Sequence, residues 1–341
     1  NVKVGNTALD SLTTGTNNTA VGNLALTACT TGQQNTAVGF GALDALTTES
    51  SNTAVGYLAM SEATTGHTSV AVGHQALFSV TTGANNVAVG GNALYTNTAD
   101  NNVAIGRDSL KLNTTGNQNV AVGAYALDAN TTAVNNTALG YSSLGANTTG
   151  ANNTSVGAGA LVANTTGTQN TAIGSLALDA NTTADENTAV GYISLSANTT
   201  GALNTAVGAY CLEDNTTGGS NTALGANALG NNTTASNNTA VGRSALQANT
   251  TGTRNIAIGS YAGTANTAQN DNIAIGYEAF KTGGVSSCNE NIAIGSYALK
   301  VSTTNAIQNT VIGHQAMESN TTGYRNVAIG YRALELNETQ N

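Results

Sequence analysis

The residue types that most often carry catalysis are few and scattered in this chain. It has three histidines and three cysteines, which are His67, His74, His314, Cys29, Cys211 and Cys288. A histidine base acts with a nucleophilic Ser or Cys in a recognisable setting, and metal or disulfide frameworks show characteristic cysteine spacing. Neither pattern occurs. We interpret the histidines as surface variation and the cysteines as small core or loop residues, and the sequence predicts a protein that is not an enzyme.

Acidic residues fall mainly in positions that vary between repeats. Examples are Asp10, Asp44, Asp128, Asp179 and Glu213. Solvated charge explains them better than paired catalytic acids. The G-G-x-G-x-D motif of calcium-binding β-rolls is absent, and the many N-x-T triplets would place glycans on adjacent coils at strand spacing, where they would collide. We therefore predict no cofactor, no metal and no glycosylation.

Tyrosine is the residue type best suited to contact a ligand. Nine of the eleven tyrosines occupy the first or second position after a recurring glycine. Those in the first position are Tyr57, Tyr141, Tyr192, Tyr277 and Tyr331, and those in the second are Tyr125, Tyr210, Tyr261 and Tyr297. An aromatic ring with a polar tip suits a sugar or a protein surface. The alternative is that the rings pack across an oligomer interface.

Composition excludes several classes of partner. Only 8% of the 341 residues are charged, the formal net charge is −9, and proline and tryptophan are absent. The nine Lys and Arg residues are spread singly, so no basic patch is available for nucleic acid or for an anionic membrane. No run of eighteen apolar residues occurs, so membrane insertion is not expected.

A repeat runs through the chain from Gly5 to Gly330. A glycine after an aliphatic residue recurs twenty times, and sixteen of the nineteen intervals are 17 residues long. The consensus is N-T-A-V-G-x-x-A-L-x-x-N-T-T-G-x-x. β-Branched residues at alternate positions before the glycine indicate a short strand, and no Asn-Gly or Asp-Gly hairpin signal occurs. The repeat predicts about twenty coils stacked in parallel, a β-solenoid.

Strand alternation places two kinds of side chain on opposite faces. In Thr36-Ala37-Val38 the Thr and Val share one face, which we expect to be the core, with Leu43 as the partner of Val38. The Ala residues would then form a small-residue stripe on the outer face. Such a stripe favours close approach of further copies of the chain, although a harmless exposed Ala row on a monomer is the alternative.

Three local features give further expectations. The N-T-T asparagines from Asn113 through Asn249 should be buried and hydrogen-bonded in a ladder. Phe280 should fill the space left above Gly263, where most coils have Leu. The enlarged turns Thr282–Asn289 and Thr303–Gln308 could form a recognition knob, or could simply reflect tolerance of insertions.

The repeat resembles a known family. Residues 35–39, 69–73, 255–259 and 326–330 are similar to the head repeats of trimeric autotransporter adhesins. The longer 17-residue unit is similar to arrays in bacteriophage tail fibres and bacterial surface proteins, often followed by a self-cleaving trimerisation chaperone. The resemblance implies a left-handed parallel β-roll and a homotrimer. This chain departs from it in having a longer turn and no stalk, anchor or chaperone segment.

Together these observations predict an all-β protein, one continuous solenoid array over residues 1–341, expected to be a fragment of a longer fibre. The predicted function is that of a structural and adhesive fibre segment, outside the cell, on a bacterial surface or a virion. Its partners would be a cell-surface glycan or protein receptor. The alternatives are a pure structural spacer or filament with recognition elsewhere, and an ice-binding solenoid.

Overall fold

Every regular element in the described part of the chain is a β-strand. The computed structural model describes residues 1–282, 288–302, 306–320 and 323–336. They form two compact units, Asn1–Gln169 and Asn170–Asn341. The expected all-β parallel solenoid, with coils of about 17 residues, is confirmed within each unit.

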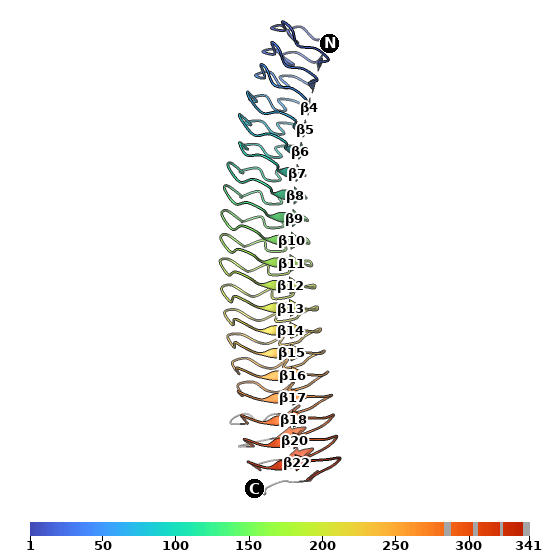
Figure 1. The fold of residues 1–341 in the computed structure, drawn as a ribbon, viewed down its shortest axis with the longest axis vertical. Coiled ribbons are helices and arrows are strands. Elements are labelled where there is room, and N and C mark those ends of the chain that lie inside the picture. The colour runs from blue at the N-terminus through green and yellow to red at the C-terminus, as the bar shows by residue number, and fades with distance from the viewer. Residues whose placement is uncertain (283–287, 303–305, 321–322, 337–341) are drawn as a thin grey trace. The chain divides into compact units, whose positions relative to one another are not determined.

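The first unit contains ten strands of three residues each, one per coil. They are β1 (Val2–Val4), β2 (Thr19–Val21), β3 (Thr36–Val38), β4 (Thr53–Val55), β5 (Val70–Val72), β6 (Val87–Val89), β7 (Val103–Ile105), β8 (Val120–Val122), β9 (Thr137–Leu139) and β10 (Thr154–Val156). Successive strands pair in parallel, and Figure 1 shows the coils from β4 to β10 one after another.

The second unit repeats this arrangement. Its strands are β11 (Thr171–Ile173), β12 (Thr188–Val190), β13 (Thr205–Val207), β14 (Thr222–Leu224), β15 (Thr239–Val241), β16 (Ile256–Ile258), β17 (Ile273–Ile275), β18 (Ile292–Ile294), β20 (Thr310–Ile312) and β22 (Val327–Ile329). A second, two-stranded sheet joins β19 (Val301–Ser302) to β21 (Ser319–Asn320). In both units like residues lie beside like, as where Ala189 pairs with Ala206.

The middle residue of every three-residue strand except β1, where Lys3 is exposed, faces the core, contrary to the sequence-based expectation. Ala20 and Ala37 are fully buried, whereas the Thr and Val on either side reach the surface. Leu43 is buried, but Val38 lies at the surface and is not its partner in the core. The predicted outer Ala stripe is therefore wrong.

The narrow interior of the coil explains this orientation. Ser155 occupies the Ala position of its strand, and its hydroxyl donates to the Ala160 carbonyl at 2.9 Å and accepts from the Ser143 hydroxyl at 2.7 Å. Opposite walls thus meet directly across the middle residue of the strand. A side chain as small as Ala or Ser fills this space in most coils. In β20 the same position holds the larger Val311, which is also fully buried.

The N-T-A-V-G pattern and the T-T-G turn each predict a glycine of positive φ. The recurring glycine of the first pattern, which we call the corner glycine, has this φ. In Gly22 φ is 135°, and a Cβ there would lie 2.5 Å from the Gly39 carbonyl oxygen of the next coil. The glycine of T-T-G differs from the prediction. The φ of Gly15 is not positive, and a Cβ at Gly15 would instead collide with the Gly32 carbonyl. Close approach of coils, rather than φ, requires that glycine.

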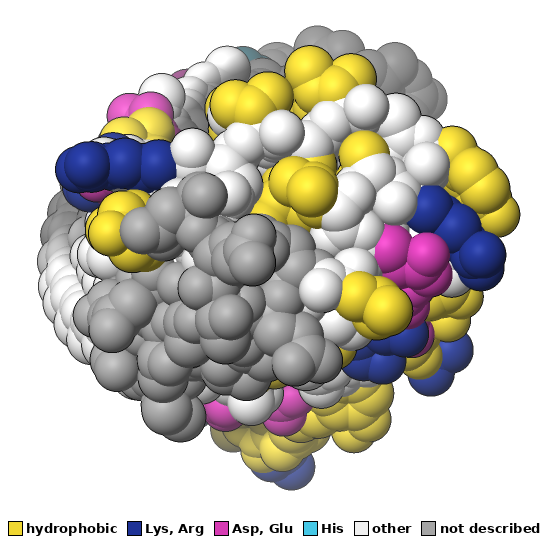
Figure 2. All heavy atoms as spheres, turned by 90° about the horizontal axis from the view of Figure 1, so that it is seen from below, with side chains coloured by type: hydrophobic (Ala, Val, Ile, Leu, Met, Phe, Trp, Pro, Cys, Tyr) yellow, Lys and Arg dark blue, Asp and Glu magenta, His cyan; other side chains and the backbone are white. Residues whose placement is uncertain are grey.

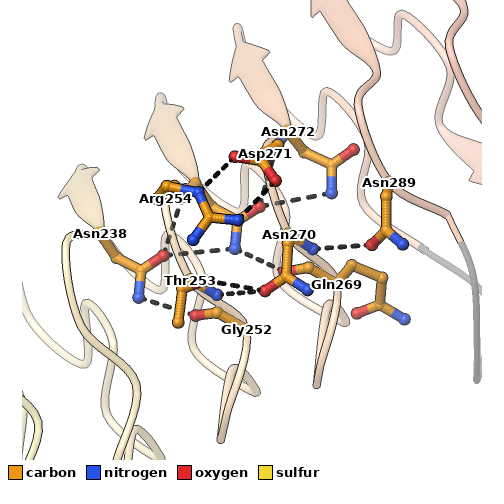
Figure 3. Close-up of polar contacts among 10 residues, drawn as sticks. Asn238, Gly252, Thr253, Arg254, Gln269, Asn270, Asp271, Asn272 and Asn289 are labelled. Atoms are coloured by element: carbon orange, nitrogen blue, oxygen red, sulfur yellow. Dashed lines mark hydrogen bonds and ion pairs between the residues drawn. The ribbon is translucent and has the colours of Figure 1, made fainter.

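Two asparagine rows join the coils. The row in the N-T-T turn is buried as predicted, and Asn130 Nδ2 donates to Asn113 Oδ1 at 2.7 Å and to its own turn at the Ala133 carbonyl. The second row precedes the strands. Each side-chain oxygen there accepts the backbone N–H of the next asparagine, as Asn238 does from Asn255 at 2.9 Å. Figure 3 shows this row beside the Arg254–Asp271 ion pair.

The irregular stretch bears out only part of the prediction that Phe280 fills the space above Gly263. Phe280 is fully buried. A side chain at Gly263, however, would first meet Leu246 of the preceding coil, with its Cβ 2.9 Å from Leu246 Cδ2. Most of the proposed recognition knob, residues 283–287 and 303–305, lies outside the described residues.

Candidate ligand-binding surface

The nine tyrosines lie at the surface, at the corner that follows each strand. Six are exposed, which are Tyr57, Tyr141, Tyr192, Tyr210, Tyr277 and Tyr331, and the other three, Tyr125, Tyr261 and Tyr297, are partly exposed. Their position follows from the corner glycine, because the chain turns there and the next two residues point away from the core. The tyrosines therefore remain available to a ligand or to another chain.

Rings from successive coils contact one another. Coil spacing follows strand spacing, ~4.8 Å, which brings equivalent side chains into van der Waals range. The pairs are Tyr125–Tyr141, Tyr192–Tyr210, Tyr261–Tyr277 and Tyr277–Tyr297, with ring centroids 5.8, 5.5, 6.3 and 5.4 Å apart and planes at 82° to 88°. These edge-to-face contacts are favourable and hold each ring in a defined orientation.

Sequence reasoning missed the other members of these columns. Phe40 and His74 stack on either side of Tyr57. His314 likewise lies between Tyr297 and Tyr331. Phe40, Tyr57 and His74 follow one another at 17 residues, as do Tyr297, His314 and Tyr331, so the repeat length applied to all aromatic residues would have found these members. His74 and His314, interpreted as surface variation, are parts of aromatic columns.

One tyrosine pair borders a shallow hollow in the first unit. It has a volume of about 490 Å³ and is lined by Tyr125, Asp128, Ala129, Tyr141, Ser142, Gly145, Ala146 and Val162. We call it the Tyr125–Tyr141 hollow. Gly145 leaves it open, because a Cβ at this position would lie 3.5 Å from Asp128 Oδ1. The absence of a side chain at Gly145 exposes one oxygen of the Asp128 carboxylate.

The charges around the hollow balance. Burial raises the pKa of Asp128 above its ordinary value. Arg107 lies over the Tyr125 ring, 4.9 Å from its centroid, and pairs with Asp108 at 3.2 Å. Asp108 also pairs with Lys111 at 3.1 Å. Although burial alone would raise the pKa of Asp108, hydrogen bonds and the two cations lower it. Two carboxylates and two cations leave no net local charge.

Charged side chains occupy the space beside a second tyrosine pair, Tyr261 and Tyr277. Lys281 Nζ donates to Glu278 Oε1 at 2.9 Å, and Lys300 Nζ lies 3.5 Å from the other carboxylate oxygen. The hydrogen bond from Lys281 lowers the pKa of Glu278, and a hydrogen bond to Glu278 raises the pKa of Tyr277. Figure 2 shows Lys, Arg, Asp, Glu and hydrophobic side chains beside one another at the surface viewed from below.

Neither a metal-binding cluster nor an accessible thiol occurs among the described residues. In the described ranges no cluster of three His, Cys, Asp or Glu could hold a metal ion. The three cysteines are buried, as interpreted from the sequence, and burial raises the pKa of Cys211 to about 12. A buried thiol with so high a pKa is a poor nucleophile.

A scan against protein-family models and a search of curated proteins found no match to this chain.

Proposed function

We propose that this chain is an adhesive segment of an extracellular fibre, which binds a cell-surface glycan or protein through its surface tyrosines. The supporting observation is the set of aromatic columns. Their rings are exposed at one repeated position, the corner after each strand, and the neighbouring rings hold them in place. Aromatic rings held in this way lose little entropy on binding.

The coil structure supports a structural role as well. Within each unit, backbone pairing and the asparagine row before the strands join successive coils, as in the bonds from the Asn35 backbone N–H to Asn18 Oδ1 and from Asn18 Nδ2 to the Gly32 carbonyl. Each such bond replaces water at a buried amide and depends on the neighbouring coil. A surface built on this framework would present ligand contacts at a constant spacing.

A homotrimer of left-handed coils is part of the proposal. It rests on the resemblance of the strand motifs to adhesin heads and on the aliphatic outer face of the strands, where Val55, Ile105 and Leu139 are exposed. The Ala rows give no support, because they are buried. Light scattering should report three times the chain mass of 33.8 kDa. A stable monomer at micromolar concentration would refute the trimer.

An extracellular site on a bacterial surface or a virion fibre is likewise proposed from the resemblance. None of the described residues forms a helix with the length and apolar character needed to cross a membrane.

Attachment of the purified segment tests the adhesive function. Beads coated with the chain should adhere to host cells or to immobilised glycans. A variant with the six exposed tyrosines changed to Ser should adhere less while keeping its β-sheet circular dichroism. If coated beads do not adhere, the segment is a spacer and recognition lies elsewhere. Ice binding is disfavoured, because Val70, Val87 and Val103 interrupt the outer Thr row of the first unit.

A further inference from the structure

We propose that the Tyr125–Tyr141 hollow is a binding subsite for a neutral pyranose ring. This rests on the proposed adhesive function and names the ligand class of one part of the surface. The apolar face of the sugar would lie on Tyr141, and two adjacent sugar hydroxyls would donate to Asp128. The three features that lead to this assignment are an exposed ring, an accessible carboxylate and a recess between them.

The exposed ring is Tyr141, the more exposed member of its pair at 61%. Tyr125 holds it edge to face, at 82° between the planes, so its orientation is set before a ligand arrives. The ring face carries partial negative charge and attracts the C–H groups on one side of a pyranose. Arg107 already lies over Tyr125, so Tyr141 is the ring left for stacking.

The carboxylate is accessible because the next coil lacks a side chain above it. At the equivalent place in an earlier coil pair, Ser61 Oγ donates to Asp44 Oδ1 at 3.0 Å. Asp128 has Gly145 at that position, which supplies no such donor. The exposed oxygen of the ionised carboxylate has two lone pairs and can accept hydrogen bonds from a pair of neighbouring hydroxyls. Ser142 in the wall offers one further hydroxyl.

The charge balance selects a neutral ligand. A quaternary ammonium group could also lie against two aromatic rings and a carboxylate. Arg107 and Lys111 both pair with Asp108, and their two charges sum to zero with those of Asp108 and Asp128, so the surroundings give little net attraction to a cation or to an anion. The shallow shape of the hollow implies affinity in roughly the millimolar range for one sugar, with avidity along a fibre supplying the rest.

The test uses saturation-transfer NMR on the methyl glycosides of glucose, galactose and mannose, with the full chain as purified. We expect saturation of at least one glycoside, and an affinity about tenfold lower in Tyr141→Ala and in Asp128→Asn. Tyr141→Phe keeps the ring and should retain binding. Tyr324→Ala is the matched control, because Tyr324 is an exposed ring outside the aromatic columns. Its affinity should not change.

Three results would overturn the subsite. They are no saturation of any of the three glycosides, equal affinity in Tyr141→Ala and wild type, and stronger saturation of tetramethylammonium than of the sugars. Each differs from failure of the proposed function, because coated beads that adhere equally well with and without Tyr141 would keep the adhesive role and remove only this subsite.

Discussion

The same aromatic arrangement occurs twice, once in each unit, with different consequences. In the first unit Arg107, Tyr125 and Tyr141 come from three successive coils, and in the second unit Arg243, Tyr261 and Tyr277 do the same. The residue spacings are identical, 18 and then 16. Ring distances and angles are also similar. The aromatic frame is therefore common to both regions.

The regions differ in the residues around that frame. Asp128, Ser142 and Gly145 of the first region correspond to Thr264, Glu278 and Lys281 of the second. In the first region the Asp128 carboxylate faces an open hollow. In the second region the Glu278 carboxylate contacts two lysines, Lys281 and Lys300. The comparison shows that the fifth residue after the corner glycine decides whether a tyrosine pair borders a recess or a salt bridge.

The largest expected effect concerns a feature that both regions share. Gly140→Ala should lower the free energy of unfolding by about 3 kcal/mol, because φ is 140° and the new Cβ would lie 2.5 Å from the Gly157 carbonyl oxygen. Gly145→Ala should change it by less than about 1 kcal/mol. Urea denaturation of both variants compares them. Equal losses would show that the two glycines serve the fold alike.

Closing the hollow should abolish its binding. Gly145→Lys makes the first region resemble the second and places a side chain over Asp128 Oδ1. We expect an affinity for the methyl glycosides at least about tenfold lower at unchanged stability, measured by saturation transfer and by urea denaturation. Lys is accommodated at this position in the second region, so folding is expected. Unchanged affinity would mean that the sugars bind elsewhere.

The contributions of Glu278 and Asp128 to stability should change with pH in opposite directions. Glu278 has a lowered pKa, so its stabilisation is present above the ordinary carboxyl value and is lost as pH falls through its folded-state pKa. Asp128 has a raised pKa, so its ionised form costs stability, and protonation relieves this cost as pH falls. Carboxyl-carbon NMR titration measures both.

Lys281→Met sharpens this pH comparison. The pKa of Glu278 should rise when its principal hydrogen-bond donor is removed, while that of Asp128 stays the same. A Glu278 titration that does not move would show that Lys300 alone holds the carboxylate.

The smallest expected effect is a gain of binding in the second region. Lys281→Gly together with Thr264→Asp copies the two residues that expose the carboxylate in the first region. We expect weak new saturation of the glycosides, in a background where Tyr141→Ala has removed the first subsite. Glu278 remains in place of Ser142, so the new site should be the weaker one. No gain would show that the aromatic frame and these two residues are not sufficient.

Much of the molecule follows from the sequence by itself. The 17-residue period requires coils, and the absence of proline and of hairpin signals favours parallel stacking. A period locked to the backbone also aligns like with like, which is why the asparagine ladder from Asn113 and the tyrosine positions were predictable. These features depend only on residue spacing, which the sequence of a repeat protein gives directly.

Tertiary structure alone decided which face of each strand is inside. Alternation separates Ala37 from Thr36 and Val38 but does not say which face is buried, and hydrophobicity favoured Val. The short distance between opposite walls, seen at Ser143 and Ser155, favours a small side chain there in most coils. The hollow was likewise decided by tertiary structure. The exposure of Asp128 depends on the missing side chain at Gly145 of the next coil, and one repeat alone does not show which residues of two coils lie together.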